Sequence, residues 1–423
     1  MDIQTKKLAE GITLYMLPDG KFKNCVQGIY FSMPLQKETA TTLALLPKLL
    51  TAGNAHFADR TTLNMELETL YGARFRASAE KLGEVHAISF VGDCIADAYA
   101  GEDLFSQMQA LMQTLICQPK TNNGAFDASI VNREKEALRE DIRSVVNDKR
   151  RYALVRCSEE MCKNEPYGCR ADGREEDLDA ITPESAYALY QKMLQTAQVD
   201  IFITGAFDAE KAEKGARTLA DMLGDRTGGY PKTMRQRAGE VQYVEDKEAV
   251  LQGKLVIGYR TDIDPASNEY YALLVYNAVF GGGTSSKLFN NVREKMSLCY
   301  YASSALERTK GLLFVQSGIE FANYKVALDA ILAQSEEIAA GTVSDAEFSG
   351  AVQGLCNQLR SYKDSPTLLM GYYRRQIPTG RVTDIDSEIE KILAVKPEEI
   401  QAVARQIHMD TVYFLNGTGG EAR

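Results

Sequence analysis

The hydrophobic and polar positions of the chain follow the same order in two places. Between residues 178 and 205, an apolar pair precedes the triplet Thr-Pro-Glu at 182–184, and a short polar turn and an apolar run ending in glycine follow. The triplet is typical of a helix start, with an N-cap, a proline at the first helical position and an acid in the first turn. Residues 392–417 repeat this order. Pro183 and Pro397 lie 397 − 183 = 214 residues apart, about half the chain, which predicts a duplicated unit.

A second pair of segments supports the duplication. Leu70–Gly92 and Leu298–Gly318 each contain two strand-like runs joined by a charged turn, and each comes after a helical pattern that ends at glycine. Each half therefore reads as strand, helix, helix, hairpin, helices and a final strand. Residues 224–253 are rich in glycine and charge, which indicates a linker. We expect an α+β fold with an N-terminal half at 1–223, a linker at 224–253 and a C-terminal half at 254–423.

The composition narrows the possible partners and the location. The 423 residues carry 48 Lys and Arg against 58 Asp and Glu, a formal net charge of −10, so we expect no nucleic-acid partner. The N-terminus has no uninterrupted apolar stretch, and no run approaches about 18 uncharged apolar residues, so we expect neither a signal peptide nor a membrane association. The eight cysteines are scattered, which favours reduced thiols and a cytoplasmic location.

A glycine-rich turn, a helix and a strand follow one another in Phe280–Ser304, which reads FGGGTSSKLFNNVREKMSLCYYASS. This segment resembles the C-terminal half of the insulinase-like M16 zinc peptidases, in particular the short M16B chains, in which an arginine is followed seven residues later by a tyrosine. The resemblance covers nearly the whole chain. It implies a duplicated two-layer α/β sandwich of the LuxS/metallohydrolase-like type, with two homologous halves joined into a clam shell.

The arginine and tyrosine of this pattern are Arg293 and Tyr300, to which the resemblance gives the role of binding the backbone of a peptide substrate. The chemistry suits that role, because a guanidinium offers planar, charged donors to a carbonyl or carboxylate and a phenol can donate to an oxyanion. A surface arginine and a tyrosine packed on the sheet are the alternative interpretation. Tyr301 is a further alternative, since a slip of one residue in register would exchange the two tyrosines.

The resemblance also implies an inverted zinc motif, H-x-x-E-H, on the first helix of the N-terminal half. In that motif two histidines bind the metal, the glutamate is the general base and a distant glutamate completes the site. The corresponding helix here is TTLALLPKLLTAG, at Thr41–Gly53. Its terminal glycine places Ala44 and Lys48 at the histidine positions and Pro47 at the glutamate position. None of these three residues can do the chemistry.

Other residues do not restore the zinc site. His56, His86 and His408 are the three histidines of the chain, and they are too far apart in sequence to form a local pair. Glu140 stands at the place of the third zinc ligand, while the upstream acidic position holds Arg133. A single glutamate on a charged helix is more commonly solvated. We therefore expect no metal and no other cofactor in this chain, with Glu140 as a vestige of the third-ligand position.

Two segments, Asn147–Ala153 and Glu159–Tyr167, resemble the YmfF-like members of the family, which lack the zinc motif. Such chains resemble the non-catalytic member of a heterodimer. Our leading hypothesis is a subunit that is not a peptidase alone, binds an extended peptide by edge-strand pairing with help from Arg293 and Tyr300, and partners a zinc-bearing M16B homologue. The alternatives are a scaffold or assembly protein without peptide handling, and a self-sufficient zinc peptidase with rearranged ligands.

Two further patterns have simpler interpretations. The turn Gly281–Lys287 lacks the glycine directly before Lys-Ser/Thr that a phosphate-binding loop requires, so we expect a helix stop and a turn into the next helix. Cys157, Cys162 and Cys169 are spaced C-x4-C and C-x6-C without the C-x2-C pairs of a zinc ribbon. We expect these cysteines to be structural, on and after a helix that ends before Pro166.

Overall fold

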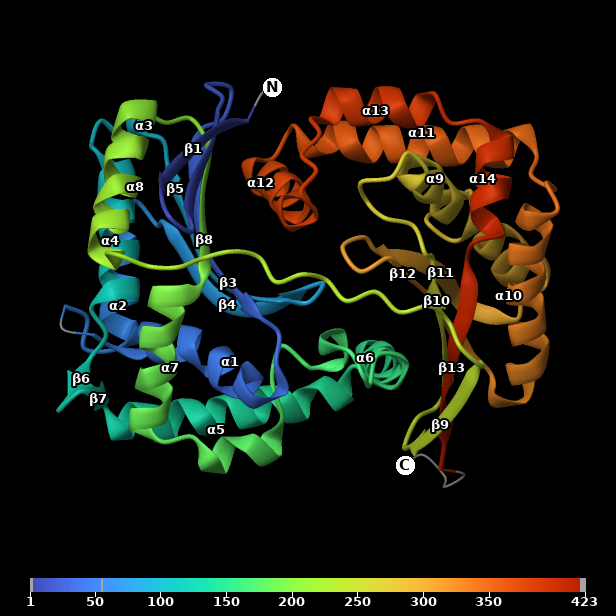
Figure 1. Ribbon diagram of the computed structural model, residues 1–423, viewed down its shortest axis with the longest axis horizontal. Helices are drawn as coiled ribbons and strands as arrows, with labels where there is room; N and C mark the ends of the chain where they lie inside the picture. The colour runs from blue at the N-terminus through green and yellow to red at the C-terminus, as the bar shows by residue number, and fades with distance from the viewer. Residues whose placement is uncertain (1–2, 55, 419–423) are drawn as a thin grey trace. The chain divides into compact units, whose positions relative to one another are not determined.

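Two sheets, each with its own helices, organise the computed structural model, which describes residues 3–54 and 56–418 (Figure 1). The first compact unit consists of the described residues of 1–143, 169–232 and 362–374. The second consists of those of 144–168, 233–361 and 375–423. The mixed α/β composition and the two-half plan confirm the fold class predicted from the sequence.

The sheet of the first unit has six strands in the order β1-β2-β8-β3-β5-β4. The strands are β1 (Gln4–Ala9), β2 (Ile12–Pro18), β3 (Asn24–Pro34), β4 (Arg74–Leu82), β5 (Val85–Ile95) and β8 (Gln198–Gly205). Strands β2 and β8 run parallel, whereas the other neighbours are antiparallel. Because side chains alternate along a strand, Ile29 and Phe31 of β3 enter the main core while Tyr30 faces the opposite side.

Helices cover one face of this sheet and bury the main core against it. Figure 1 shows α4 (Leu104–Cys117) and α8 (Ala209–Leu223) along that face. α1 (Lys37–Ala52) and α7 (Pro183–Thr196) contribute to the same core. Apart from α6 (Lys149–Met161), the remaining elements before residue 182 are α2 (Arg60–Thr69), α3 (Asp97–Ala100), the β6–β7 hairpin (Thr121–Asn122 and Ala125–Phe126), α5 (Ala128–Ser144) and the short 3₁₀ turns η1 (Val145–Asn147), η2 (Pro166–Gly168) and η3 (Glu175–Ala180).

The sheet of the second unit has five strands in the order β11-β12-β10-β13-β9. They are β9 (Gln242–Glu248), β10 (Gly253–Arg260), β11 (Cys299–Glu307), β12 (Leu312–Ile319) and β13 (His408–Gly417). The unit's helical elements after residue 253, apart from α12 (Pro366–Gln376), are α9 (Tyr270–Phe280), η4 (Leu288–Lys295), η5 (Phe321–Asn323), α10 (Tyr324–Ala339), α11 (Asp345–Tyr362), η6 (Ile377–Thr379), α13 (Ile385–Leu393) and α14 (Pro397–Ala404). In the part of the chain that the structure describes, no helix is long and apolar enough to cross a membrane.

The strand orders confirm the internal duplication. Read from one edge, β4-β5-β3-β8-β2 matches β11-β12-β10-β13-β9, and the parallel pair stands at the same place, β8 with β2 and β13 with β9. Pro183 and Pro397 begin the matching helices α7 and α14, as the sequence predicts. Strand β9 lies inside the segment predicted as a linker. An edge strand needs only every second residue half-buried, so a polar sequence such as this one can form it. The part of the predicted linker without helix or strand before β9 is therefore 224–241. The predicted domain boundaries remain a prediction.

The two units exchange one helix each between the chain halves. α6 (Lys149–Met161) belongs to the second unit, where Cys157 and Met161 pack against the sheet on the face opposite α10 (Figure 1). α12 (Pro366–Gln376) begins in the first unit, where Tyr30 donates a hydrogen bond to Met370 Sδ at 3.2 Å. Arg374 stacks on the same tyrosine ring and pairs with Glu80 at 2.6 Å. Each sheet therefore has its second face covered by a helix from the other half of the chain.

The start of the linker is fixed to the first unit by a buried carboxylate. Tyr230 donates a hydrogen bond to Asp200 of β8, and Gln198 donates to the same carboxylate at 3.2 Å. Upstream, Gly11 and Gly228 approach so closely that a Cβ on Gly11 would lie 2.7 Å from the Gly228 Cα. Asp200 is 2 % exposed, and burial raises the pKa of its carboxyl from 3.8 to about 6.

This raised pKa predicts a pH dependence of stability. The folded state binds the Asp200 proton more tightly than the unfolded chain, so the contribution to stability is complete below pH 3.8 and is lost as the pH rises through about 6. Asp200→Asn cannot ionise and keeps an acceptor for Tyr230. We expect this variant to exceed the wild type in free energy of unfolding by about 1–3 kcal/mol at neutral pH and to match it in acid, by urea denaturation.

The exposed Asp225 supplies the control for this experiment. Asp225→Asn removes an exposed carboxylate from the start of the linker and leaves the buried Asp200 in place. Its free energy of unfolding should therefore change with pH as that of the wild type does. If the free energies of unfolding of the wild type and of Asp200→Asn changed with pH in the same way, the raised pKa of Asp200 would be contradicted.

Candidate functional site

The helix that would carry a zinc motif is α1, and its three key positions hold no metal ligand. Ala44 and Pro47 are buried in the helix and offer no side-chain donor atom. The Lys48 ammonium forms an ion pair with Asp141 of α5, with 2.6 Å between Nζ and Oδ2. Lys48, one of the expected ligand positions, is therefore engaged in an ion pair between α1 and α5.

The acid that pairs with Lys48 of α1 is Asp141, the neighbour of Glu140 in sequence. The Glu140 side chain is 73 % exposed and lies 3.6 Å from Arg143 of its own helix. Seven residues before Asp141, Glu134 is buried and accepts from Arg60 at 2.6 Å. Because seven residues are close to two helical turns, Glu134 and Asp141 share one face of α5. The spacing of seven residues between Glu134 and Asp141 is therefore the signal in the sequence that identifies Asp141 as the acid on the same helix face as Glu134.

The donor set does not fit a catalytic zinc, which needs three nitrogen, sulfur or oxygen ligands around one open position. Within residues 3–54 and 56–418, no three His, Cys, Asp or Glu side chains are grouped to hold a metal ion. The histidines lie apart in the fold: His86 is buried in β5, His408 opens β13 and His56 contacts Gln118 at 2.8 Å. No reaction step through a metal can be assigned to this chain.

Arg293 lies on η4, a π-helical segment that follows the glycine-rich turn. The backbone N–H of Met296 donates to the Asn291 carbonyl five residues earlier, at 2.9 Å. The Arg293 side chain is 39 % exposed, stacks on Phe289 at 4.7 Å and lies 3.4 Å from Glu294. Its guanidinium is held by its own helix and remains accessible. Segments of π-helix are uncommon in proteins, and those that occur are frequently found at functional sites.

Tyr300 is the bulged residue of β11. Cys299 is opposite Ile319 and Tyr301 is opposite Gly318, so Tyr300 is left without a partner on β12. It is 63 % exposed and donates to Glu320 at 2.7 Å; this hydrogen bond and the glutamate charge raise the pKa of its phenol. Bulges re-aim side chains at the edges of sheets. The hydrogen bonds and ion pairs of Arg293 and Tyr300 do not join the two side chains.

Tyr301 lies over the sheet face that α6 covers. Its ring rests on Gly318, where a Cβ would lie only 2.5 Å from the ring. The guanidinium carbon of Arg150 is 4.3 Å from the ring centroid. Burial raises the pKa of Tyr301 to about 12. The two adjacent tyrosines therefore have different surroundings, as the alternation of a strand requires.

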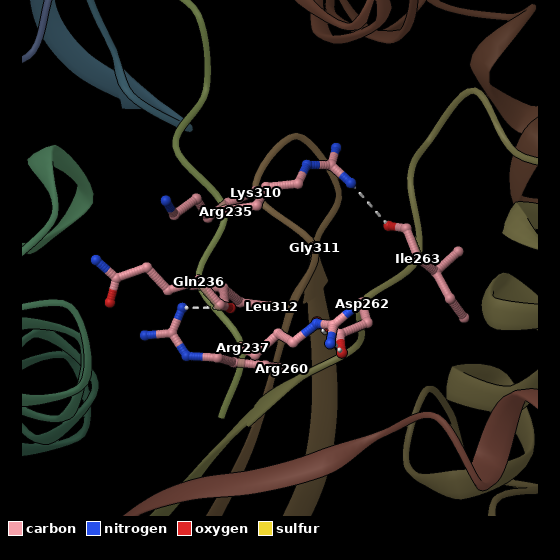
Figure 2. Close-up of a pocket in the computed structure, with 9 residues that line it drawn as sticks. All are labelled: Arg235, Gln236, Arg237, Arg260, Asp262, Ile263, Lys310, Gly311 and Leu312. Atoms are coloured by element: carbon pink, nitrogen blue, oxygen red, sulfur yellow. Dashed lines mark hydrogen bonds and ion pairs between the residues drawn. The ribbon is translucent and has the colours of Figure 1, made fainter. Parts of the chain in front are cut away.

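A pocket of about 180 Å³ opens in the second unit between the linker, β10 and the β11–β12 turn (Figure 2). Nine residues line it: Arg235, Gln236, Arg237, Arg260, Asp262, Ile263, Lys310, Gly311 and Leu312. Figure 2 shows Arg260 reaching the backbone of Gln236 and Arg235 reaching the carbonyl of Ile263, at 3.2 Å in both cases. These contacts hold the linker against the sheet.

The buried cations beside this pocket are already neutralised. Arg260 pairs with Asp410 at 2.7 Å and with Glu165 at 2.6 Å, and Lys310 pairs with Glu165 at 2.5 Å. Arg260 also donates to the Met161 carbonyl at the end of α6, at 2.9 Å. Because each charge has its counter-ion, the cluster is better suited to fixing α6 and the linker on the sheet than to binding an anion.

The remaining sequence patterns have the simple structures expected of them. Gly281 ends α9, and Lys287 is buried with Glu337 at 2.8 Å and Glu347 at 3.2 Å, so the glycine-rich turn carries no free lysine for a phosphate. Cys157 and Cys162 are buried on and just after α6. Cys169 is half-buried in a bend well beyond α6. The prediction for the glycine-rich turn is confirmed, and the helix predicted to end before Pro166 is found as α6, with only Cys157 of the three cysteines on it.

Comparison with known proteins places this geometry in a family. Residues 180–355 match the family model described as the Peptidase M16 inactive domain. The chain is 34% identical over 412 residues to the probable inactive metalloprotease YmfF of Bacillus subtilis, which covers 97% of each chain. The chain belongs to the M16 peptidase family. Within that family it is a YmfF-like member of the non-catalytic kind, in agreement with the residues found on α1.

Other M16 relatives and solved structures extend this result. The uncharacterized zinc protease YmxG of Bacillus subtilis is 21% identical to this M16 chain over 67% of its length and 69% of the relative. A conserved protein from Enterococcus faecalis has a TM-score of 0.90 at 29% identity, covering 100% of both chains. A peptidase M16 inactive domain from Pseudomonas fluorescens has a TM-score of 0.81 at 16% identity, covering 99% of both, which supports the fold alone.

The Arg260 cluster allows a direct test of what fixes α6 and the linker to the sheet. Arg260→Met leaves Asp410 and part of Glu165 buried without a counter-ion, so we expect a loss of about 3–5 kcal/mol in free energy of unfolding, measured with urea. Arg237→Met is the control, since that side chain lines the same pocket but is 91% exposed. Its effect should stay within about 0.5 kcal/mol. Equal midpoints for the two variants would rule out the structural role.

Proposed function

We propose that this chain is the non-catalytic, peptide-binding subunit of a heterodimeric metallopeptidase whose zinc-bearing subunit is an M16 homologue. The observation that carries the proposal is the contrast between two places in the fold. The metal-ligand positions of α1 hold Ala44, Pro47 and an ion-paired Lys48. The arginine and tyrosine positions of the second half are occupied by Arg293 and Tyr300, with accessible side chains.

Edge strand β11 supports the peptide-binding part of the proposal. In the sheet as described, β11 is hydrogen-bonded to β12 on one side and is the last strand on the other. An extended peptide can add to such an edge through main-chain hydrogen bonds. Tyr300 projects from this strand beside the bulge, where its hydroxyl could donate to a peptide carbonyl in place of Glu320.

The division of labour between the subunits follows from the side chains that each would supply. A zinc ion in the partner would activate the attacking water. This chain would hold the peptide backbone through β11, Arg293 and Tyr300, and so would contribute orientation. We propose the cytoplasm as the location, which agrees with the eight free cysteines.

The first test concerns the isolated chain. Because the α1 positions lack ligands, we expect the purified protein to hold no stoichiometric zinc by plasma mass spectrometry and to cleave no quenched fluorescent peptide. Bound zinc together with cleavage that a chelator abolishes would instead establish the self-sufficient peptidase with rearranged ligands.

The second test uses the reconstituted pair, this chain with a zinc-bearing M16 homologue from the same genome. We expect Arg293→Ala and Tyr300→Phe each to lower kcat/KM by about tenfold or more, because each removes a donor to the bound peptide. Tyr243→Phe is the matched control, since Tyr243 is 64% exposed on the other edge strand of the same sheet, against 63% for Tyr300. Full activity in the Arg293 and Tyr300 variants would favour the scaffold protein.

A further inference from the structure

Two cations lie together on the sheet face beside β11. The Arg150 guanidinium stacks on the Tyr301 ring at 4.3 Å, and the Lys254 ammonium lies 5.9 Å from the centroid of the same ring. Arg150 donates to Ser303 Oγ and to Gln316 Oε1, both at 3.2 Å. It therefore touches two residues of β11 that share one face of the strand, Tyr301 and Ser303.

Neither of these cations forms an ion pair with an acid among the described residues. Lys254 donates to the neutral Gln252 at 2.6 Å, and the carboxylate of Asp148 accepts from the backbone N–H groups of Arg150 and Arg151 as the N-cap of α6. Burial and the nearby Arg150 lower the pKa of Lys254, and the charge of Asp148 acts in the opposite direction. Two positive charges therefore stand here against one nearby carboxylate, which is already engaged by backbone N–H groups.

Neighbouring cations of the same segment are paired, which makes this pair stand apart. Lys149 lies 3.3 Å from Glu248, and Arg156 contacts Asp246 at 2.8 Å and Glu160 at 3.0 Å. The buried cations beside the linker pocket are compensated as well. An arginine held rigidly by an aromatic ring and neutral donors is ready to take a planar anion without a further loss of side-chain freedom.

A strand added to β11 would bring side chains to these cations. Neighbouring strands lie about 4.8 Å apart, and residues directly opposite one another have Cβ atoms about 5 Å apart on the same face. A residue opposite Tyr301 or Ser303 would therefore emerge on the face where Arg150 stacks. An acidic side chain, or the terminal carboxylate of a peptide that ends there, is within reach of Arg150, whereas Lys254 lies two strands further in, on β10, and adds its charge at longer range.

We propose that Arg150 and Lys254 form a carboxylate-binding subsite for the peptide that pairs with β11, so that the chain selects acidic peptides or peptide C-termini. This inference rests on the proposed peptide-binding function and adds the class of ligand. Arg150 would bind the carboxylate through the guanidinium edge that its present hydrogen bonds leave free, and Lys254 would add a second charge. Both cations lie against the Tyr301 ring, which rests on Gly318 of β12.

Fluorescence anisotropy with labelled valine- and threonine-rich peptides tests the subsite. One peptide has a central Glu and a free C-terminus, one has Gln and an amidated C-terminus, and two carry a single carboxylate each. We expect at least one carboxylate peptide to bind about tenfold more tightly than the neutral one. The two single-carboxylate peptides show whether the subsite prefers a side-chain carboxylate or a terminal carboxylate. This preference should weaken as salt is added.

Variants assign the preference to the two cations. Arg150→Gln and Lys254→Gln should each lower the affinity for the carboxylate peptide about fivefold to tenfold and leave the neutral peptide unchanged. Lys247→Gln is the matched control, since it removes one exposed positive charge from β9 at the opposite edge of the sheet. Circular dichroism melts check that the variants fold.

The outcomes separate this inference from the function on which it rests. Equal binding of neutral and acidic peptides, or equal losses in Arg150→Gln and Lys247→Gln, would overturn the subsite and leave peptide binding intact. Failure of every peptide to bind, with the zinc-bearing partner present, would overturn both.

Discussion

The buried guanidinium of Arg260 connects three segments that are far apart in the chain. It pairs with Asp410 of β13 and Glu165 after α6, and it donates to the backbone of the linker at Gln236. A buried arginine is tolerated only when its charge and hydrogen-bonding groups are satisfied, so the three segments stabilise one another through it. The position of α6 on the second sheet, and with it the position of Arg150, depends on this compensated cluster.

Charge compensation also separates structural from functional cations in this fold. Arg260, Lys310 and Lys287 are buried with acids beside them, which makes them part of the packing. Arg150 and Lys254 are held by neutral groups and keep their charge available for a ligand. The same residue types thus serve opposite purposes, and the difference lies in the partners that the fold provides.

The M16 fold persists here without the donor set of a zinc peptidase. Ala44 and Pro47 are buried residues of α1 without metal-binding atoms, and the Lys48–Asp141 ion pair bridges α1 and α5. A half-exposed pair of this type contributes little stability, about 0–1 kcal/mol. The loss of the metal site has therefore not been replaced by a strong contact, and the fold rests on its sheets, its core and the exchanged helices.

The sequence alone predicts the repeated elements, since proline-initiated helices, glycine stops and strand alternation are local signals. It also determined the loss of the zinc motif, because no fold can give Ala44 or Pro47 a metal-binding atom. Tertiary structure decided which acid faces Lys48, because a shift of one residue on α5 rotates a side chain by about 100° and turns Glu140 away. It alone decided the helix exchange, the bulge at Tyr300 and the meeting of Arg150 with Lys254. Contacts between residues a hundred or more positions apart follow from packing, which local patterns do not encode.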